Sequence, residues 1–362
     1  MSAGSGPGSP GLIFALGVPP CTTPAGLSLA VGRPGLSLRP RPKGRGFRLL
    51  NVIPAIVASD HEAAAIASRD GAAAEAVADR FDIPAAYEGY DTLLADGSLD
   101  AVYVPLPNGL HAEWTRRAAD AGLHVLCEKP LTGSAPETGA VFDYCEDRGV
   151  VMMEALMYRF HPLTERASAV VSEELGEVRS VTSTFTFRMP DGADDVRLDP
   201  DLEGGSVLDV GTYPVNAARL FLGEPDRVYA TTHDARDCGV DTEMAGVLAY
   251  DSGASARVQS GFETPLTQYH RVETTDGWLR ADPTFDVDVD GPTSLTYAVD
   301  GREVTETFDP ADHYRLEVEH FADAIERGET PRIDREESVA HARVLDALFE
   351  SADEGRAVPV EN

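Results

Sequence analysis

The sequence contains almost no lysine. Lys43 and Lys129 are its only lysines, and the other 28 of its 30 basic residues are arginines. Its 61 acidic residues give the 362-residue chain a formal net charge of −31. Such a charge repels phosphate backbones, which excludes a general nucleic-acid-binding protein. Because salt screens self-repulsion, the composition is typical of a halophilic protein from a salt-loaded cytoplasm, rather than of a merely acidic mesophilic one.

Cysteines and long apolar runs are also scarce. Cys21, Cys127, Cys145 and Cys238 have no metal-binding or redox spacing, so a disulfide framework is excluded and a reducing, cytoplasmic location is expected. No apolar run reaches the ~18 residues that cross a bilayer, which excludes a membrane-spanning protein. The histidines show no ligand spacing, so no metal site is expected.

Acidic residues are absent from the front of the chain, where the first is Asp60. Residues 1–46 are rich in glycine, proline, serine and arginine, a composition typical of a disordered or loosely packed segment. They do not resemble a secretory signal. We interpret their foreign composition as a misplaced start or a frame error in the gene, which mass spectrometry of the native N-terminus would test.

Residues 47–158 alternate short apolar strands with helices of about ten residues. Strands are expected at 63–67, 99–104, 124–127 and 150–154, and helices at 52–58, 72–81, 90–95, 111–121 and 136–148. This alternation predicts a doubly wound parallel sheet of the Rossmann type, a dinucleotide-binding domain.

Residues 159–362 have a different texture. Period-two alternation recurs between residues 177 and 308, with short loops typical of hairpins. Helices are expected at 163–175, 206–222, 312–327 and 335–352. The pattern predicts an α+β domain with a large, mostly antiparallel sheet that binds substrate and mediates oligomerisation.

The phosphate-binding loop of such a dinucleotide domain has three candidate positions. A literal G-x-G-x-x-G at residues 6–11 is rejected, because it contains prolines and neither follows a strand nor opens a helix. Gly44 and Gly46 precede the first predicted helix, but the prolines upstream cannot lie inside a sheet. Residues 12–18 could instead form the first strand, with a loop at 19–24. A chain without any phosphate loop is an equal alternative.

The end of the second predicted strand carries Ser68 and Arg69. An acid here would bind the ribose 2′-hydroxyl of NAD, whereas an arginine can pair with the 2′-phosphate of NADP. We therefore expect NADP, with NAD as the alternative cofactor. The other interpretation of Arg69 is an ordinary arginine at a helix start.

Two further segments leave strands at their carboxyl ends, where ligands of doubly wound sheets bind. One contains Pro105, Leu106, Asn108 and His111; Asn108 either contacts the cofactor or only caps the following helix. The other contains Glu128 and Lys129. A lysine retained where lysine is otherwise replaced suggests a specific need for an amine.

Three motifs carry a family resemblance. They are VYVPLPNGLHAEWTRRAADAGLHVLCEKPL at residues 102–131, EALMYRFHP at 154–162 and GGSVLDVGTYPVNAAR at 204–219. The chain from about residue 51 resembles the glucose-fructose oxidoreductase/inositol dehydrogenase (Gfo/Idh/MocA) family. It looks closest to the NADP-dependent D-xylose dehydrogenases and dimeric dihydrodiol dehydrogenases. The family's first strand and glycine-rich loop are not recognisable.

The resemblance implies a catalytic set. It places Lys129 beside the nicotinamide and the reacting hydroxyl, and makes Tyr213 the general base with Lys129 favouring its phenolate. Asp209, four residues before Tyr213 and on the same helix face, would orient the sugar hydroxyl or the lysine. Tyr158 and Arg159 would line the sugar site, although Arg159 could equally pair with acids.

The resulting expectation is an enzyme that transfers hydride from the C1 hydroxyl of an aldose, of the D-xylose or D-glucose type, to NADP and gives a lactone. The alternatives are a trans-dihydrodiol or polyol dehydrogenase, a non-catalytic dinucleotide- or sugar-binding regulator, and a chain inactive because its front is altered. We also expect a homodimer or homotetramer, formed through the open face of the second sheet.

Overall fold

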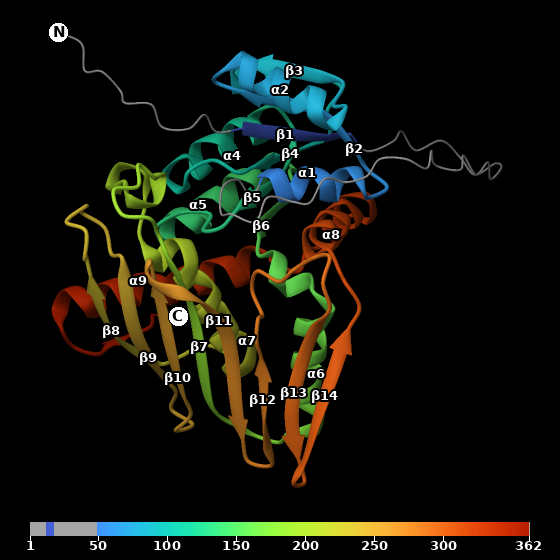
Figure 1. Ribbon diagram of the computed structural model, residues 1–362. Helices are drawn as coiled ribbons and strands as arrows, with labels where there is room; N and C mark the ends of the chain where they lie inside the picture. Colours follow the sequence, from blue (N-terminus) through green and yellow to red (C-terminus); the bar gives the residue numbers. More distant parts are fainter. Residues whose placement is uncertain (1–11, 18–48, 362) are drawn as a thin grey trace.

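A computed structural model describes residues 12–17 and 49–361 of the chain. Within these ranges the chain forms a six-stranded sheet and a nine-stranded sheet, each flanked by helices (Figure 1). The predicted α/β domain followed by an α+β domain is therefore confirmed.

The six-stranded sheet has the strand order β3-β2-β1-β4-β5-β6, which is the order of a doubly wound dinucleotide-binding sheet. Its strands are β1 (Leu12–Gly17), β2 (Glu62–Ser68), β3 (Ala85–Glu88), β4 (Ala101–Val104), β5 (His124–Glu128) and β6 (Met152–Ala155). The helices between them are α1 (Leu49–Val57), α2 (Gly71–Phe81), α3 (Tyr90–Leu94), α4 (His111–Asp120) and α5 (Ala135–Glu146).

The first strand departs from the expected parallel arrangement. β1 pairs antiparallel with both β2 and β4, so that Leu12 lies beside Ser68 and Gly17 beside Glu62. The ladders β2–β3, β4–β5 and β5–β6 are parallel. Residues 12–17 therefore supply the first strand, in reverse, and the expectation that all of residues 1–46 are loosely packed does not hold for them.

The nine-stranded sheet has the order β14-β13-β12-β11-β7-β10-β9-β8-β15, and among its described ladders only β7–β10 is parallel. Its strands are β7 (Val178–Arg188), β8 (Arg227–His233), β9 (Glu243–Ala249), β10 (Ser255–Gly261), β11 (Glu263–Thr274), β12 (Gly277–Ala281), β13 (Thr293–Val299), β14 (Arg302–Phe308) and β15 (Val358–Pro359). The Asp300-Gly301 loop between β13 and β14 has φ of 52° and 73°, as a tight hairpin turn requires.

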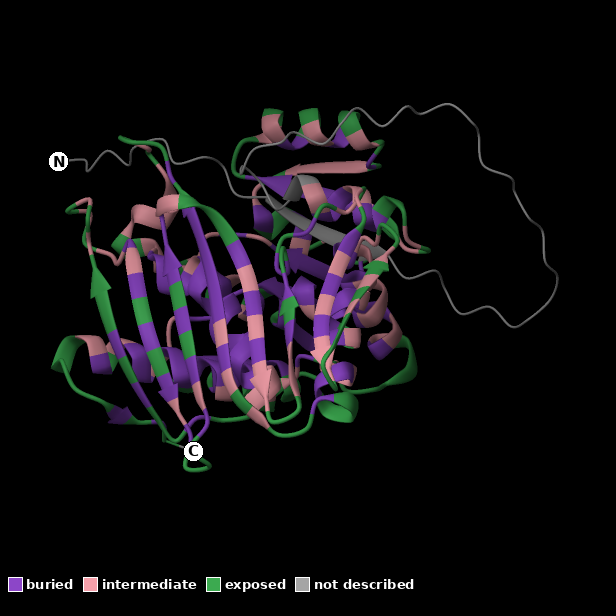
Figure 2. Cartoon of the chain, turned by 60° about the horizontal axis from the view of Figure 1, so that its bottom comes forward, coloured by how far each residue is buried: buried purple, intermediate pink, exposed green. Residues whose placement is uncertain are grey.

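Helices cover one face of the nine-stranded sheet. They are α6 (Pro162–Glu174), α7 (Thr212–Leu222) and α9 (Arg335–Glu354). Along β8, β9 and β10 buried and less buried residues alternate, whereas residues 183–187 of the central strand β7 are all buried. None of the described helices packs on the opposite face (Figure 2). This alternation follows from the two-residue period of a half-covered strand.

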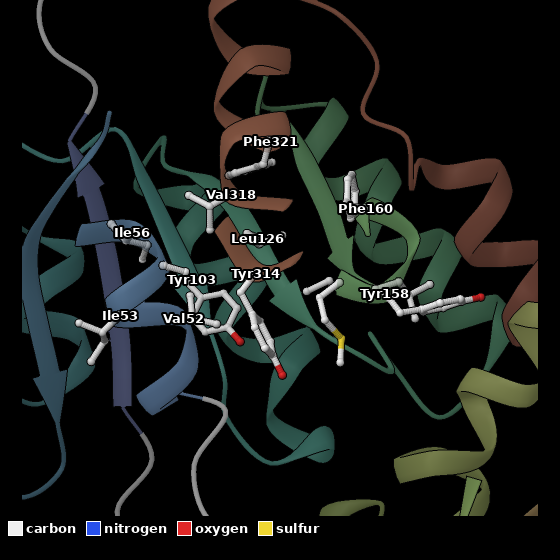
Figure 3. Close-up of a cluster of buried hydrophobic side chains, with 14 of the residues drawn as sticks. Val52, Ile53, Ile56, Tyr103, Leu126, Tyr158, Phe160, Tyr314, Val318 and Phe321 are labelled. Carbon is white, nitrogen blue, oxygen red and sulfur yellow. The ribbon is translucent and has the colours of Figure 1, made fainter. Parts of the chain in front are cut away.

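The end of the chain returns to the first domain. Helix α8 (His313–Arg327) contributes Tyr314, Val318 and Phe321 to a core that also contains Ile53 and Ile56 of α1 (Figure 3). The short helix η2 (Met157–Phe160) lies in the same core. A division of the chain at residue 158 therefore separates segments that pack together.

Candidate active site

Lys129 lies directly after β5, at the carboxyl end of the first sheet, and its side chain is only 1% exposed. Its ammonium donates a hydrogen bond to the backbone carbonyl of Asp209 and lies 3.6 Å from the carboxylate Oδ1 of the same residue. The same nitrogen lies 4.9 Å from the centre of the Tyr213 ring. The fold thus brings together the three residues that the resemblance assigned to catalysis, from both domains.

Tyr213 is almost completely buried. Its ring contacts Tyr158, Phe185 and Phe285 at centroid distances of 5.9, 5.4 and 5.5 Å, and its hydroxyl lies 3.3 Å from Met157 Sδ. An aromatic cluster of this kind fixes the ring and excludes water.

Asp209 lies in a π-helical turn, η5 (Val207–Gly211), that leads directly into α7. The predicted single helix over residues 206–222 is therefore interrupted at its start. In an i→i+5 register the Asp209 carbonyl faces residue 214, which is a proline without an N–H group. The carbonyl can thus accept a hydrogen bond from Lys129 without opening the helix further.

Arg197 joins this site, and the sequence reasoning missed it. It lies on the short helix η3 (Val196–Leu198), with its Nε 3.0 Å from Asp209 Oδ2 and its Nη1 2.9 Å from Asp195 Oδ2. Asp195, Arg197, Asp209 and Lys129 therefore form a row of alternating charges. In the sequence, only the position of this arginine among several aspartates could have indicated its place in the site. Ion pairing at the surface explains the same pattern equally well.

Burial shapes the surroundings of Lys129. Glu154 of β6 is buried and accepts a hydrogen bond from the Leu131 amide at 2.9 Å. Burial raises the pKa of Glu154, whereas the charge of Lys129 opposes that rise. Glu128 is also buried and accepts a hydrogen bond from the Tyr103 hydroxyl of β4.

At the end of β2, Arg69 is exposed, and Ser68 is buried with its hydroxyl accepting from the Asp70 amide at 3.1 Å. Burial raises the pKa of Tyr90, and the charge and hydrogen bond of Arg69 oppose this rise. Two acids lie beside this position: Asp70 caps α2 by accepting from the Ala72 amide at 3.0 Å, and Glu88 of β3 is the strand partner of Ser68. The exposed guanidinium of Arg69 remains to meet a ribose phosphate, so this position fits NADP.

Side chains in the loop between β4 and α4 tie loops together. Asn108 donates to the backbone carbonyl of Glu203 at 2.8 Å, which links the first domain to the helix η4 region (Pro200–Leu202) of the second. The buried His111 lies 2.7 Å from the carbonyls of both Leu106 and Pro130. Burial lowers the pKa of His111. His111 is thus a brace between the two loops at the site, and the expectation of direct contact with a cofactor does not fit its complete burial.

Tyr158 and Arg159 do not point into the Lys129 site as expected. The buried Tyr158 donates its hydroxyl hydrogen bond to Asn216 at 2.5 Å, and Arg159 binds Asn216 and Glu337 at 3.2 and 3.1 Å. These contacts belong to an ion-pair network, and the alternative interpretation of Arg159, pairing with acids, is the one observed.

Other parts of the chain add less to the site. Gly44 and Gly46 lie outside the described residues, whereas Pro105 and Leu106 lie at the carboxyl end of β4 as expected. Among the described residues no group of three or more metal-ligating side chains is placed to hold a metal ion. No described helix is long and apolar enough to cross a membrane.

Comparisons with known proteins identify the family to which both parts of the chain are similar. Residues 44–156 match the model of an oxidoreductase family with an NAD-binding Rossmann fold, and residues 165–280 match the GFO/IDH/MocA C-terminal domain. D-xylose 1-dehydrogenase (NADP(+)) 2 of Haloferax volcanii is 70% identical over 87% of this chain and 97% of its own length.

Solved structures share the architecture. A 3-ketoreductase from Actinomadura kijaniata in complex with NADP and TDP-benzene aligns with a TM-score of 0.79 and 34% identity, over 83% of this chain and 93% of that one. An aldose-aldose oxidoreductase from Caulobacter crescentus aligns with a TM-score of 0.79 and 29% identity, over 85% and 95% of the two chains.

Proposed function

The chain belongs to the GFO/IDH/MocA family of oxidoreductases, and from this premise we propose that it is an NADP-dependent aldose 1-dehydrogenase acting on D-xylose or a similar sugar. The observation that carries the proposal is the convergence of Lys129, Asp209 and Tyr213 at the carboxyl edge of the first sheet. The 70% identity to a D-xylose dehydrogenase supports the choice of substrate.

In this proposal the hydride-accepting chemistry at C1 of the sugar would be supplied by bound NADP. Arg69 and Ser68 would hold its 2′-phosphate side, and the backbone near Pro105, Asn108 and Glu128 would hold its nicotinamide side. These positions lie at the carboxyl ends of β2, β4 and β5, where such ligands bind.

The protein's own residues handle the proton. Tyr213 as phenolate accepts the proton of the C1 hydroxyl, while the hydride leaves the same carbon, so that a lactone remains. The ammonium of Lys129, above the Tyr213 ring, favours the charged form of the base. Both the backbone carbonyl and Oδ1 of Asp209 face this ammonium, which supports orientation of the lysine as its role.

A spectrophotometric panel tests the assignment. Purified protein in molar salt is mixed with NADP or NAD and with D-xylose, D-glucose, xylitol or a trans-dihydrodiol, and formation of reduced cofactor is followed. Reduction with aldoses and NADP, together with lactone in the products, is the expected result. Turnover of the dihydrodiol or polyol but of no aldose would contradict the proposal. Cofactor binding without turnover would favour a non-catalytic regulator.

We further propose a homodimer through the open face of the nine-stranded sheet. Tyr229 and Val247 are directly paired on β8 and β9 and are 43% and 42% exposed, so they form an apolar pair on this face. Light scattering in molar salt should give a dimer or a tetramer. Val247→Arg should shift the particle toward the monomer, and a wild-type monomer would refute the assignment.

We also infer that the protein requires high salt. The net charge of −31 and the similarity to a Haloferax enzyme support this inference. Self-repulsion should destabilise the fold at low ionic strength, where the Debye length grows to about 30 Å at 0.01 M. A thermal midpoint that does not fall on dilution from molar salt would argue against it.

A further inference from the structure

Arg197 competes with Lys129 for one carboxylate. Asp209 presents Oδ2 to Arg197 Nε at 3.0 Å, and Oδ1 to Lys129 Nζ at 3.6 Å. The closer contact belongs to the arginine. On its other side the guanidinium also hydrogen-bonds Asp195 Oδ1 and Oδ2, at 3.2 and 2.9 Å, so its position is fixed from two directions.

This division of Asp209 has a consequence for Lys129. A carboxylate drawn fully against the ammonium would offset much of its charge, because Coulomb attraction grows as the separation shrinks. With Arg197 in place, the lysine instead donates to the neutral carbonyl of Asp209 and lies over the Tyr213 ring. More of the ammonium's charge therefore acts on the phenol.

We propose that Arg197 is a positioning residue that holds the carboxylate of Asp209 away from Lys129 and so keeps the lysine charge directed at Tyr213. The inference rests on the proposed function for its catalytic meaning, but its structural core concerns only these four side chains. Arg197 would act on the reaction through Asp209 and Lys129 rather than through the substrate.

Other titratable groups also surround Lys129 and set the background for any pH dependence. They include Glu128 on β5, Glu154 on β6, His111 on α4 and His341 on α9. Their hydrogen-bond partners are the Tyr103 hydroxyl, the Leu131 amide, the Pro130 carbonyl and the Thr212 hydroxyl. If replacing Arg197 changes the titration of Lys129 only when Asp209 is present, the change is therefore assigned to competition between Arg197 and Lys129 for the Asp209 carboxylate.

The scarcity of lysine makes the test direct. Protein labelled with ¹³C-lysine carries only two lysines, Lys43 and Lys129, and the Lys129 signal is assigned by its loss in Lys129→Met. Titration of this signal is compared between wild type, Arg197→Met, Asp209→Asn and the double variant, all without cofactor. Arg197→Gln replaces Arg197→Met if that variant does not fold.

Arg197→Met should let Asp209 close on Lys129. Shortening the separation from 3.6 Å to about 2.8 Å at an effective dielectric of about 20 should strengthen proton binding by Lys129 about tenfold. In the Asp209→Asn background the same change should have a much smaller effect. An equal effect in both backgrounds would mean that Arg197 acts only through its own charge, and it would overturn the proposal, as would no effect at all.

A second measurement uses the enzyme with NADP and sugar. Arg197→Met should lower kcat with little change in KM and move the rise of rate with pH to higher pH, and Arg197→Lys should restore part of both. Arg236→Met is the matched control, because it removes an arginine paired with Glu263 in the same domain; it should leave the pH profile unchanged. An unmoved profile in Arg197→Met would overturn the catalytic consequence. If wild type shows no turnover, the proposed function fails, while the lysine titration still decides the competition.

Discussion

The site predicts that removing the hydroxyl group has opposite effects at two neighbouring tyrosines: turnover is lost at one and stability at the other. Tyr213 and Tyr158 are both about 1% exposed and their rings meet edge to face. Only Tyr213 faces Lys129, whereas the Tyr158 hydroxyl is bound to Asn216. Removing either hydroxyl leaves a phenyl ring in the same aromatic cluster, so the two variants are matched.

The magnitude follows from the geometry. A charge 4.9 Å from the ring centre is worth about 3 kcal/mol at an effective dielectric of about 20, which favours phenolate about a hundredfold. Lys129→Met should therefore lower turnover at neutral pH by about 10²-fold, and Tyr213→Phe by at least as much, the usual scale for a lost general base. The double variant should lose little beyond the worse single one, as for groups that act together.

Tyr158→Phe should show the reverse. It should cost about 1–3 kcal/mol of unfolding free energy, because Asn216 loses a buried partner, yet keep near-normal turnover. The assays are NADP reduction across a pH series and thermal unfolding of each variant in molar salt. If Tyr213→Phe kept full activity and an unchanged pH profile, Tyr213 would not be the base. Severe loss of turnover in Tyr158→Phe with an unchanged KM would also count against the assignment.

Three other expectations concern different parts of the molecule. Arg69→Asp should reduce use of NADP far more than use of NAD, and equal losses in the two kcat/KM values would refute the role of Arg69 in cofactor choice. Deleting residues 1–17 removes β1, whereas deleting residues 1–11 keeps it. The longer deletion should have a thermal midpoint lower by several degrees or more. Equal midpoints would contradict the pairing of β1 with β2 and β4. Burial alone would raise the pKa of Glu337, but the charges of Arg219 and Arg159 outweigh it and lower this pKa to about 2. Glu337→Gln should therefore cost about 3 kcal/mol of unfolding free energy near neutral pH. This difference from wild type, measured by chemical unfolding, should shrink as pH falls from about 4.5 through 2. A difference that does not depend on pH would show that the charge of Glu337 is not responsible.

The periodic parts of the sequence predicted most of the fold. Continuous apolar runs gave β4 and β5, and period-two alternation gave β7 and β13, because burial on two faces or one leaves those patterns. The strands β3 and β12 were missed, since their sequences, AAYE and GWLRA, are neither continuous apolar runs nor long alternations. The direction of β1 could not be predicted from the sequence either, because side chains alternate between the faces of a sheet whichever way a strand runs.

The candidate site was proposed from residues that are unusual for this chain or belong to a recognisable motif. Lys129 stood out as the one lysine after residue 43, and Asp209 and Tyr213 stood out by their spacing and motif. Arg197 lies in an irregular segment with no period to place it. The short helix η2 directs the polar groups of Tyr158 and Arg159 toward Asn216 and Glu337, and no local sequence pattern records that orientation.

The antiparallel strand β1 is a weak point of the first sheet. Among the described ladders, only β1 connects the β2–β3 pair to the β4–β5–β6 group. Detachment of this strand would expose the backbone edges of β2 and β4 together, and unpaired edges are templates for pairing with other chains. Resistance to aggregation would then rest on the large negative charge, which keeps copies apart most strongly in dilute salt, just where the same charge weakens the fold.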